Sequence, residues 1–165
     1  MAVRMTRSWK NYKSLCRIME KNSIEYICDD NELSVRCTLN GRDADHSFIF
    51  EIDSARMLIT LASPLELSVP EKKNADLAIA VCMINNTLKD GCFGIDFNEH
   101  TIYFTLTSSF YESDINGRLF EYMLSAAADT VDEYYPKLQK LMKCAAPVQD
   151  DNTMPLTLLS DIIYE

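Results

Sequence analysis

Hydrophobic side chains recur with two different periods along the first half of the chain. Near the N-terminus the spacing is helical, with Trp9, Tyr12, Cys16 and Met19 on one face. From residue 33 onward the period is two, which is typical of half-buried strands. The apolar positions of three such strands are Leu33, Val35, Cys37 and Leu39, then Phe48, Phe50 and Ile52, then Met57, Ile59 and Leu61. The pattern predicts a helix followed by an antiparallel meander.

A second helix is expected after Pro70, running to about Asp90, where Gly91 can adopt the left-handed conformation that ends helices. Its main apolar stripe is Leu77, Val81, Ile84 and Leu88. Ile79, Cys82 and Met83 lie outside that stripe, so the helix is apolar nearly all round and needs cover on two faces. We predict that these three residues form a dimer or partner interface, unless strands or the terminal segment cover them within one chain.

Two more strands follow, joined by a polar turn at Asn98, Glu99 and His100, and then a long helix that Pro136 is expected to bend or divide. The apolar positions of the strands are Phe93, Ile95 and Phe97, then Ile102, Phe104 and Leu106. The element order is therefore α-β-β-β-α-β-β-α. Short links between strands indicate an antiparallel sheet with segregated helices, an α+β architecture.

The chain divides into one predicted domain, residues 1–144, and a linker with a C-terminal apolar segment, residues 145–165. In that segment Leu156, Leu159 and Ile163 recur at i, i+3 and i+7, which predicts a short amphipathic helix. Such a helix is too short to be stable alone in water. It should therefore bury this stripe in an apolar groove of its own domain or of another molecule, and we count these three residues among the predicted interface.

Charge is distributed unevenly over the 165 residues, whose formal net charge is −9. The first 21 residues carry Arg4, Arg7, Lys10, Lys13, Arg17 and Lys21 against the single acid Glu20. The acidic balance argues against nucleic acid as a partner. The basic face could attract an anionic membrane, but attraction to the chain's own acidic body is the simpler interpretation. No apolar run is long enough to span a membrane, and six cysteines without C-x-x-C spacing suggest reduced thiols in the cytoplasm.

Candidate catalytic chemistry is sparse. His46 stands beside Asp43 and Asp45, and His100 beside Glu99, yet neither group has a recognisable metal-ligand spacing. We interpret both as surface turns and expect no metal, no cofactor and no catalytic residue. An enzyme or a small-ligand protein with a site of dispersed residues around His46 or His100 is the alternative.

Several short motifs resemble those of the YbjN-type bacterial domain, which shares its fold with type III secretion chaperones. The resemblance covers roughly residues 33–142. The motifs are Leu67-Ser68-Val69-Pro70, Ile84-Asn85-Asn86, Gly94-Ile95-Asp96 and Asp132-Glu133-Tyr134-Tyr135-Pro136-Lys137-Leu138. The resemblance implies a small, usually dimeric cytoplasmic protein that is regulatory or chaperone-like and not catalytic. We therefore predict a homodimeric protein-binding module that holds a segment of an unidentified client.

Overall fold

The computed structural model describes residues 2–112, 114–144 and 154–164, with side chains from residue 6 onward. The helices are α1 (Ala2–Lys21), α2 (Asn74–Asn85), α3 (Gly117–Lys143) and α4 (Leu156–Tyr164), with a short 3-10 helix η1 (Glu71–Lys73) before α2. The strands are β1 (Tyr26–Asp29), β2 (Ser34–Asn40), β3 (Asp45–Asp53), β4 (Leu58–Leu65), β5 (Cys92–Asp96) and β6 (Thr101–Ser109).

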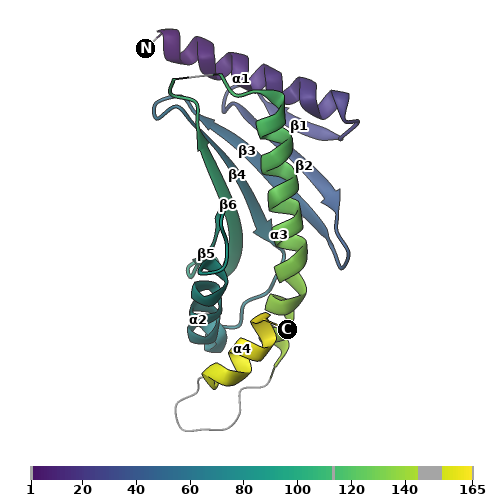
Figure 1. Ribbon diagram of the computed structural model, residues 1–165, viewed down its shortest axis with the longest axis vertical. Helices are drawn as coiled ribbons and strands as arrows, with labels where there is room; N and C mark the ends of the chain where they lie inside the picture. The colour runs from purple at the N-terminus through teal and green to yellow at the C-terminus, as the bar shows by residue number, and fades with distance from the viewer. Residues whose placement is uncertain (1, 113, 145–153, 165) are drawn as a thin grey trace.

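The six strands form one antiparallel sheet in the order β1-β2-β3-β4-β6-β5. In Figure 1, α1 lies across one end of the sheet and α3 runs along it, while α2 and α4 lie together near the far end of α3. The α+β class with segregated helices is confirmed. The meander has a fourth strand, β1, which was not predicted because three of its four residues are exposed and give no alternation.

Three hairpins of the sheet share one loop design. The carboxylate of Asp29 accepts the backbone N–H groups of Asn31 at 2.8 Å and Glu32 at 3.2 Å. Asp53 and Asp96 bind the corresponding N–H groups in their own loops. Each loop ends in a left-handed residue: Leu33 (φ 51°), Met57 (φ 58°) and His100 (φ 52°). The local side-chain hydrogen bond explains why these sequences turn where the alternation breaks.

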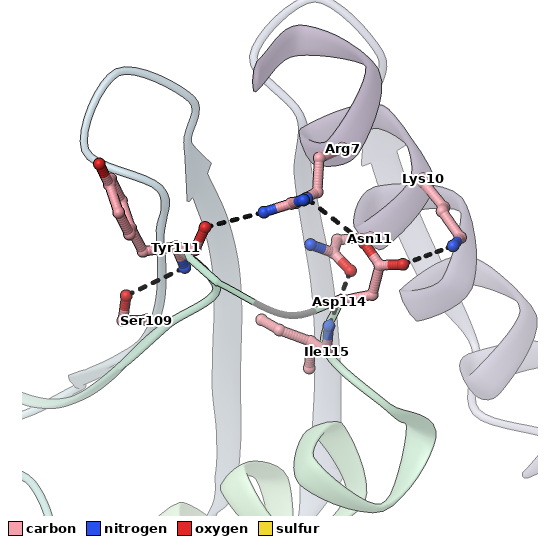
Figure 2. A network of polar contacts seen from close by, with 7 residues as sticks. All are labelled: Arg7, Lys10, Asn11, Ser109, Tyr111, Asp114 and Ile115. Atoms are coloured by element: carbon pink, nitrogen blue, oxygen red, sulfur yellow. Dashed lines mark hydrogen bonds and ion pairs between the residues drawn. The ribbon is translucent and has the colours of Figure 1, made fainter. Parts of the chain in front are cut away.

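Polar contacts fix the basic helix α1 to the chain that precedes α3 (Figure 2). Arg7 and Lys10 both reach the carboxylate of Asp114, and Arg7 also donates to the carbonyl of Tyr111 at 2.8 Å. The buried amide of Asn11 accepts the N–H of Ile115 at 3.0 Å. Farther along α1, Lys13 pairs with Asp30 and Lys21 with Glu121. These contacts confirm that basic side chains of α1 are attracted to the chain's own acidic body.

Two predicted helix features differ in the structure. Trp9 is 43% exposed, and its ring lies under the ammonium of Lys13 at 4.4 Å, so its place in the buried stripe of α1 was wrong. The long helix α3 continues through Pro136 as one helix, so the predicted division is not observed. Buried tyrosines immediately before the proline and Leu138 after it hold both halves against the core.

The predicted end of α2 was also wrong, because the helix stops at Asn85. The Asn85 side chain turns onto the backbone of β5, as described below. Gly91 is indeed left-handed (φ 73°), but it directs the chain into β5 instead of ending the helix. A Cβ atom at Gly91 would lie 2.4 Å from the ring of Phe104, so glycine is needed there for space as well as for conformation.

Candidate partner-binding surfaces

The predicted interface residues of α2 differ in how exposed they are. Cys82 is exposed, while Ile79 and Met83 are half-buried and pack against the core. The one charged residue of α2, Asp76, is buried. The helix therefore presents no charged side chain to its surroundings, which is unusual for a helix at a surface.

Helix α4 packs on α2 and α3 of the same chain, so the C-terminal segment docks within the molecule. Leu159 and Ile163 are buried as predicted, but Leu156 is 64% exposed and its predicted burial was wrong. Ile162 takes its place, so the buried stripe is displaced around the helix. The Tyr164 hydroxyl donates to the carbonyl of Met83 at 3.2 Å, which joins the end of α4 directly to α2. The predicted linker, residues 145–153, lies outside the described residues.

A buried ion pair lies where the segment before α4 meets η1 and α2. Lys73 and Asp76 are each 1% exposed, and the Lys73 ammonium lies 3.1 Å from Asp76 Oδ2. Asp76 Oδ1 accepts the backbone N–H of Met154 at 2.8 Å. Sequence reasoning missed this site, because a lysine and an aspartate three residues apart are common on exposed helices. The pair attaches the terminal segment to the domain through a charge-assisted hydrogen bond.

The two edge strands of the sheet, β5 and β1, differ in whether a side chain covers their outward backbone groups. At the β5 edge, the Asn85 side chain accepts the N–H of Phe93 at 2.8 Å and donates to its carbonyl at 3.0 Å. The amide thus occupies the position that a neighbouring strand would take. This contact shields the edge at Phe93 from pairing with another chain.

The β1 edge has no corresponding shield among the described residues. The N–H of Ile52 in β3 donates to the carbonyl of Leu33, the residue just before β2. Opposed residues of two antiparallel strands alternate between pairs that are hydrogen-bonded to each other and pairs that are not, so the odd-numbered residues of β2 bond to β3. The even-numbered residues of β2 consequently bond to Ile27 and Asp29 of β1. The N–H and C=O groups of Tyr26 and Cys28 therefore point outward. Between them, the Ile27 side chain is 76% exposed.

Side chains under β1 hold it to α1. The Tyr12 hydroxyl donates to Asp30 at 2.6 Å, and this bond, followed by that from Lys13, lowers the pKa of the Asp30 carboxyl. Burial, with a hydrogen bond to Glu20, raises the pKa of Tyr26 to about 12. The hydrogen bonds donated by the Tyr12 and Tyr26 hydroxyls thus link β1 and the residue that follows it to α1.

Two pockets lie next to each other along α3 and share Leu39 of β2 as a wall. The first, which we call the α1–α3 pocket, has a volume of about 260 Å³, and its lining is mainly apolar, with Ile18 and Met19 from α1 and Phe120 and Leu124 from α3. The second, which we call the His46 pocket, has a volume of about 320 Å³. It opens between the β2–β3 turn and α3. Together the pockets offer an apolar and a polar depression on the same side of α3.

The His46 pocket corrects our interpretation of that histidine as a surface turn residue. His46 lies in β3 and is 5% exposed, with its ring 5.0 Å from the ring of Tyr135. Only the tertiary structure brings this α3 tyrosine to it. His100, in contrast, is exposed in the β5–β6 loop, as predicted. Within the described part of the chain, no three His, Cys, Asp or Glu side chains are placed to hold a metal ion.

The fold agrees with the comparisons to known proteins. The sequence profile of the YbjN family, described as "Putative bacterial sensory transduction regulator", matches residues 11–140. The chain therefore belongs to the YbjN family. A search of curated proteins gives no match. Among the described residues, no helix is long and apolar enough to cross a membrane.

Solved structures with the same fold include E. coli YbjN, at a TM-score of 0.58 and 10% identity over 77% of this chain and 92% of the other. A chain of the HopA1–SchA chaperone–effector complex aligns with a TM-score of 0.54 and 12% identity over 82% and 97%. A chain of the ExsC–ExsE complex aligns with a TM-score of 0.53 and 15% identity over 83% and 96%. The secretion-chaperone-like fold is thereby confirmed.

Proposed function

We propose that this protein is a non-catalytic binding module that holds an extended segment of a partner protein, paired as an added strand to β1. The observation that carries the proposal is the contrast between the two sheet edges. Asn85 closes the β5 edge at Phe93, whereas β1 presents outward N–H and C=O groups beside the exposed Ile27. An open edge with an apolar side chain is the arrangement that strand addition uses.

The fold comparisons support the same proposal. The similar chains come from a chaperone–effector complex and from the ExsC–ExsE complex, so this fold is found in proteins that bind other proteins. The proposal gives the module no reaction to catalyse.

Proline at position 28 is the sharpest test of the proposal. The N–H of Cys28 points away from β2, so Cys28→Pro removes an outward donor and leaves the β1–β2 ladder intact. Cys28→Ala is the matched control, because it removes the same thiol and retains the N–H. Each full-length protein is immobilised and exposed to host-cell extract, and captured proteins are quantified by mass spectrometry. A photo-crosslinker in place of Ile27 reports whether the same protein lies against β1.

We expect the wild type and Cys28→Ala to capture one common protein that crosslinks at position 27. Cys28→Pro should reduce its capture about tenfold, the loss that about 1.4 kcal/mol of binding energy produces. Circular dichroism and thermal melting should show the same fold for all three proteins. Equal capture by the proline and alanine variants, or crosslinking only at distant positions, would show that the partner does not pair with β1.

We further propose that the protein is a homodimer that contacts its second copy through α2. The uncharged surface of α2, to which exposed Cys82 and half-buried Ile79 and Met83 contribute, supports this, because two identical neutral faces can meet without opposing like charges. A regulatory role in the cytoplasm is part of the same proposal. The six unpaired cysteines are consistent with a reducing compartment.

A further inference from the structure

We propose that the surface of α2 and α3 on which α4 packs is a binding site for an amphipathic helix of a partner protein, and that α4 is its built-in competitor. We call it the α4-binding surface; Figure 1 shows α4 lying against α2 and the end of α3. The proposal goes beyond strand addition at β1 and does not depend on it. Three features carry it: contacts to the backbone of the terminal segment, a narrow apolar stripe, and the position of α4 beyond the family domain.

Two polar side chains of the domain bind the backbone of the terminal segment. Asp76 Oδ1 accepts the N–H of Met154 at 2.8 Å, and the Lys137 ammonium donates to the carbonyl of Ile163 at 2.8 Å. Every amino acid offers a backbone carbonyl, and every one except proline offers an N–H. These two contacts therefore do not require the sequence of α4, and another helix of suitable shape can make them.

The same two contacts select the direction of the bound helix. A helix carries partial positive charge at its N-terminus and partial negative charge at its C-terminus, where the last carbonyls lack partners within the helix. The Asp76 carboxylate lies at the N-terminal end of the segment and the Lys137 ammonium at the C-terminal end. A helix bound in the reverse direction would place its carbonyls against a buried carboxylate, so the surface accepts one orientation.

The apolar contact of α4 is a narrow stripe. The side chains of Leu159, Ile162 and Ile163 are buried, and Met154 upstream is 3% exposed. The other large apolar side chains of the helix are exposed: Leu156, Leu158 and Tyr164. The chemistry of the inferred partner follows from the buried set. It is a helix with apolar residues at i, i+3 and i+4, and a further apolar residue five positions before the first.

Such a partner can compete with α4 because α4 is short. A helix of nine residues is not stable alone in water, so its order depends on the surface that receives it. Binding it therefore carries the full cost of ordering the segment. A partner helix that is already folded avoids much of this cost.

The family domain provides the surface, whereas its occupant lies outside that domain. The family profile matches residues 11–140, which include Asp76 and Lys137, and α4 begins at Leu156. While α4 is docked, the surface is closed to other helices. The apparent affinity for a partner is thus reduced in proportion to the fraction of molecules whose surface is free.

The experiment measures binding of labelled peptides to the full-length protein by fluorescence anisotropy. The tail peptide is acetylated residues 154–164, in which the acetyl group preserves the N–H of Met154 as an amide. The designed peptide, acetyl-Met-Pro-Glu-Ala-Lys-Leu-Ala-Lys-Ile-Ile-Tyr-amide, retains the buried residues and changes five others. A control peptide carries aspartate in place of the leucine and both isoleucines of the designed peptide.

The wild type is compared with Leu159→Asp, which weakens the docking of α4 and leaves the α4-binding surface unchanged. We expect this variant to bind the tail and designed peptides at least tenfold more tightly than the wild type, and neither protein to bind the control peptide. Adding Lys137→Met should weaken binding to the variant about tenfold, through loss of a charge-assisted hydrogen bond. Lys140→Met, at an exposed position of α3, is the matched control and should leave binding unchanged.

Hydrogen exchange on the wild type gives a measurement that needs no variant. A saturating concentration of the designed peptide should raise the exchange rate of residues 156–164, because displaced α4 is not a stable helix. Exchange in β3 and β4 should stay the same. If Leu159→Asp does not fold, this exchange result decides the question.

Three outcomes overturn the inference. If the designed peptide fails to bind folded Leu159→Asp, the surface accepts only the sequence of α4. If the peptide binds the wild type without faster exchange in α4, it binds elsewhere. If Leu159→Asp converts a wild-type dimer to a monomer, the occupant of the surface is α4 of a second copy and not a partner helix.

Discussion

The buried pair of Lys73 and Asp76 gives the most demanding test of how the terminal segment is held. Both side chains are 1% exposed, and among the described residues the Lys73 ammonium has one acidic partner, Asp76 Oδ2 at 3.1 Å. Asp76→Asn keeps an oxygen that can accept the N–H of Met154 but removes the countercharge. The variant therefore isolates the charge interaction from the hydrogen bond to the terminal segment.

The expected cost of Asp76→Asn is about 3–5 kcal/mol, because it leaves a buried ammonium without a counterion. Domains of this kind have a total stability of roughly 5–15 kcal/mol, so the variant should lose a large share of it. Removing the ammonium as well, in Lys73→Met with Asp76→Asn, should restore most of the loss, since an apolar replacement of a buried pair is often nearly neutral. The recovery distinguishes charge burial from lost packing.

The assay is urea unfolding followed by circular dichroism, with amide hydrogen exchange at Met154 as a local readout. Asp161→Asn on the exposed side of α4 should change the free energy of unfolding by less than about 0.5 kcal/mol. A loss below about 1 kcal/mol for Asp76→Asn would refute the reasoning, because it would mean that water reaches Lys73. A double variant no more stable than Asp76→Asn would refute it as well.

Three further predictions test other parts of the structure. Wild type should scatter light as a dimer at micromolar concentration, and Ile79→Asp with Met83→Asp should make it monomeric; a dimer that survives both changes places the interface elsewhere. Deletion of residues 154–165 should leave a folded protein that binds more of a hydrophobic dye, because α4 covers α2 and α3; unchanged dye binding would contradict this docking. Burial raises the pKa of the Cys37 thiol from 9.0 to about 11, so the thiol of the unfolded chain ionises first as the pH rises. The free energy of unfolding should therefore fall by roughly 3 kcal/mol between pH 9 and pH 11, and Cys37→Ala should flatten this decline.

The alternation of apolar and polar residues determined most of the sheet and the class of fold. Val35 and Cys37, or Phe48 and Phe50, must share a face of any strand that contains them, so their period fixes a half-buried sheet without reference to distant contacts. The breaks in the alternation located the hairpin turns, and in three of them an Asp side chain binds the backbone two and three residues ahead. The buried positions Leu159 and Ile163 of α4 followed from helical spacing in the same way.

The candidate sites depended on contacts between residues far apart in the sequence. His46 has the local surroundings of a turn, and it is buried because α3 places Tyr135 against its ring. Which face of α4 is buried depends on how α2 and α3 pack against it. Leu156 is therefore exposed although its spacing fits an apolar stripe. Strand β1 exists through pairing with β2, and its outward edge is open because no other segment of the described chain shields it. Local sequence restricts which faces a segment can bury, but the partner that buries them is supplied by the rest of the chain.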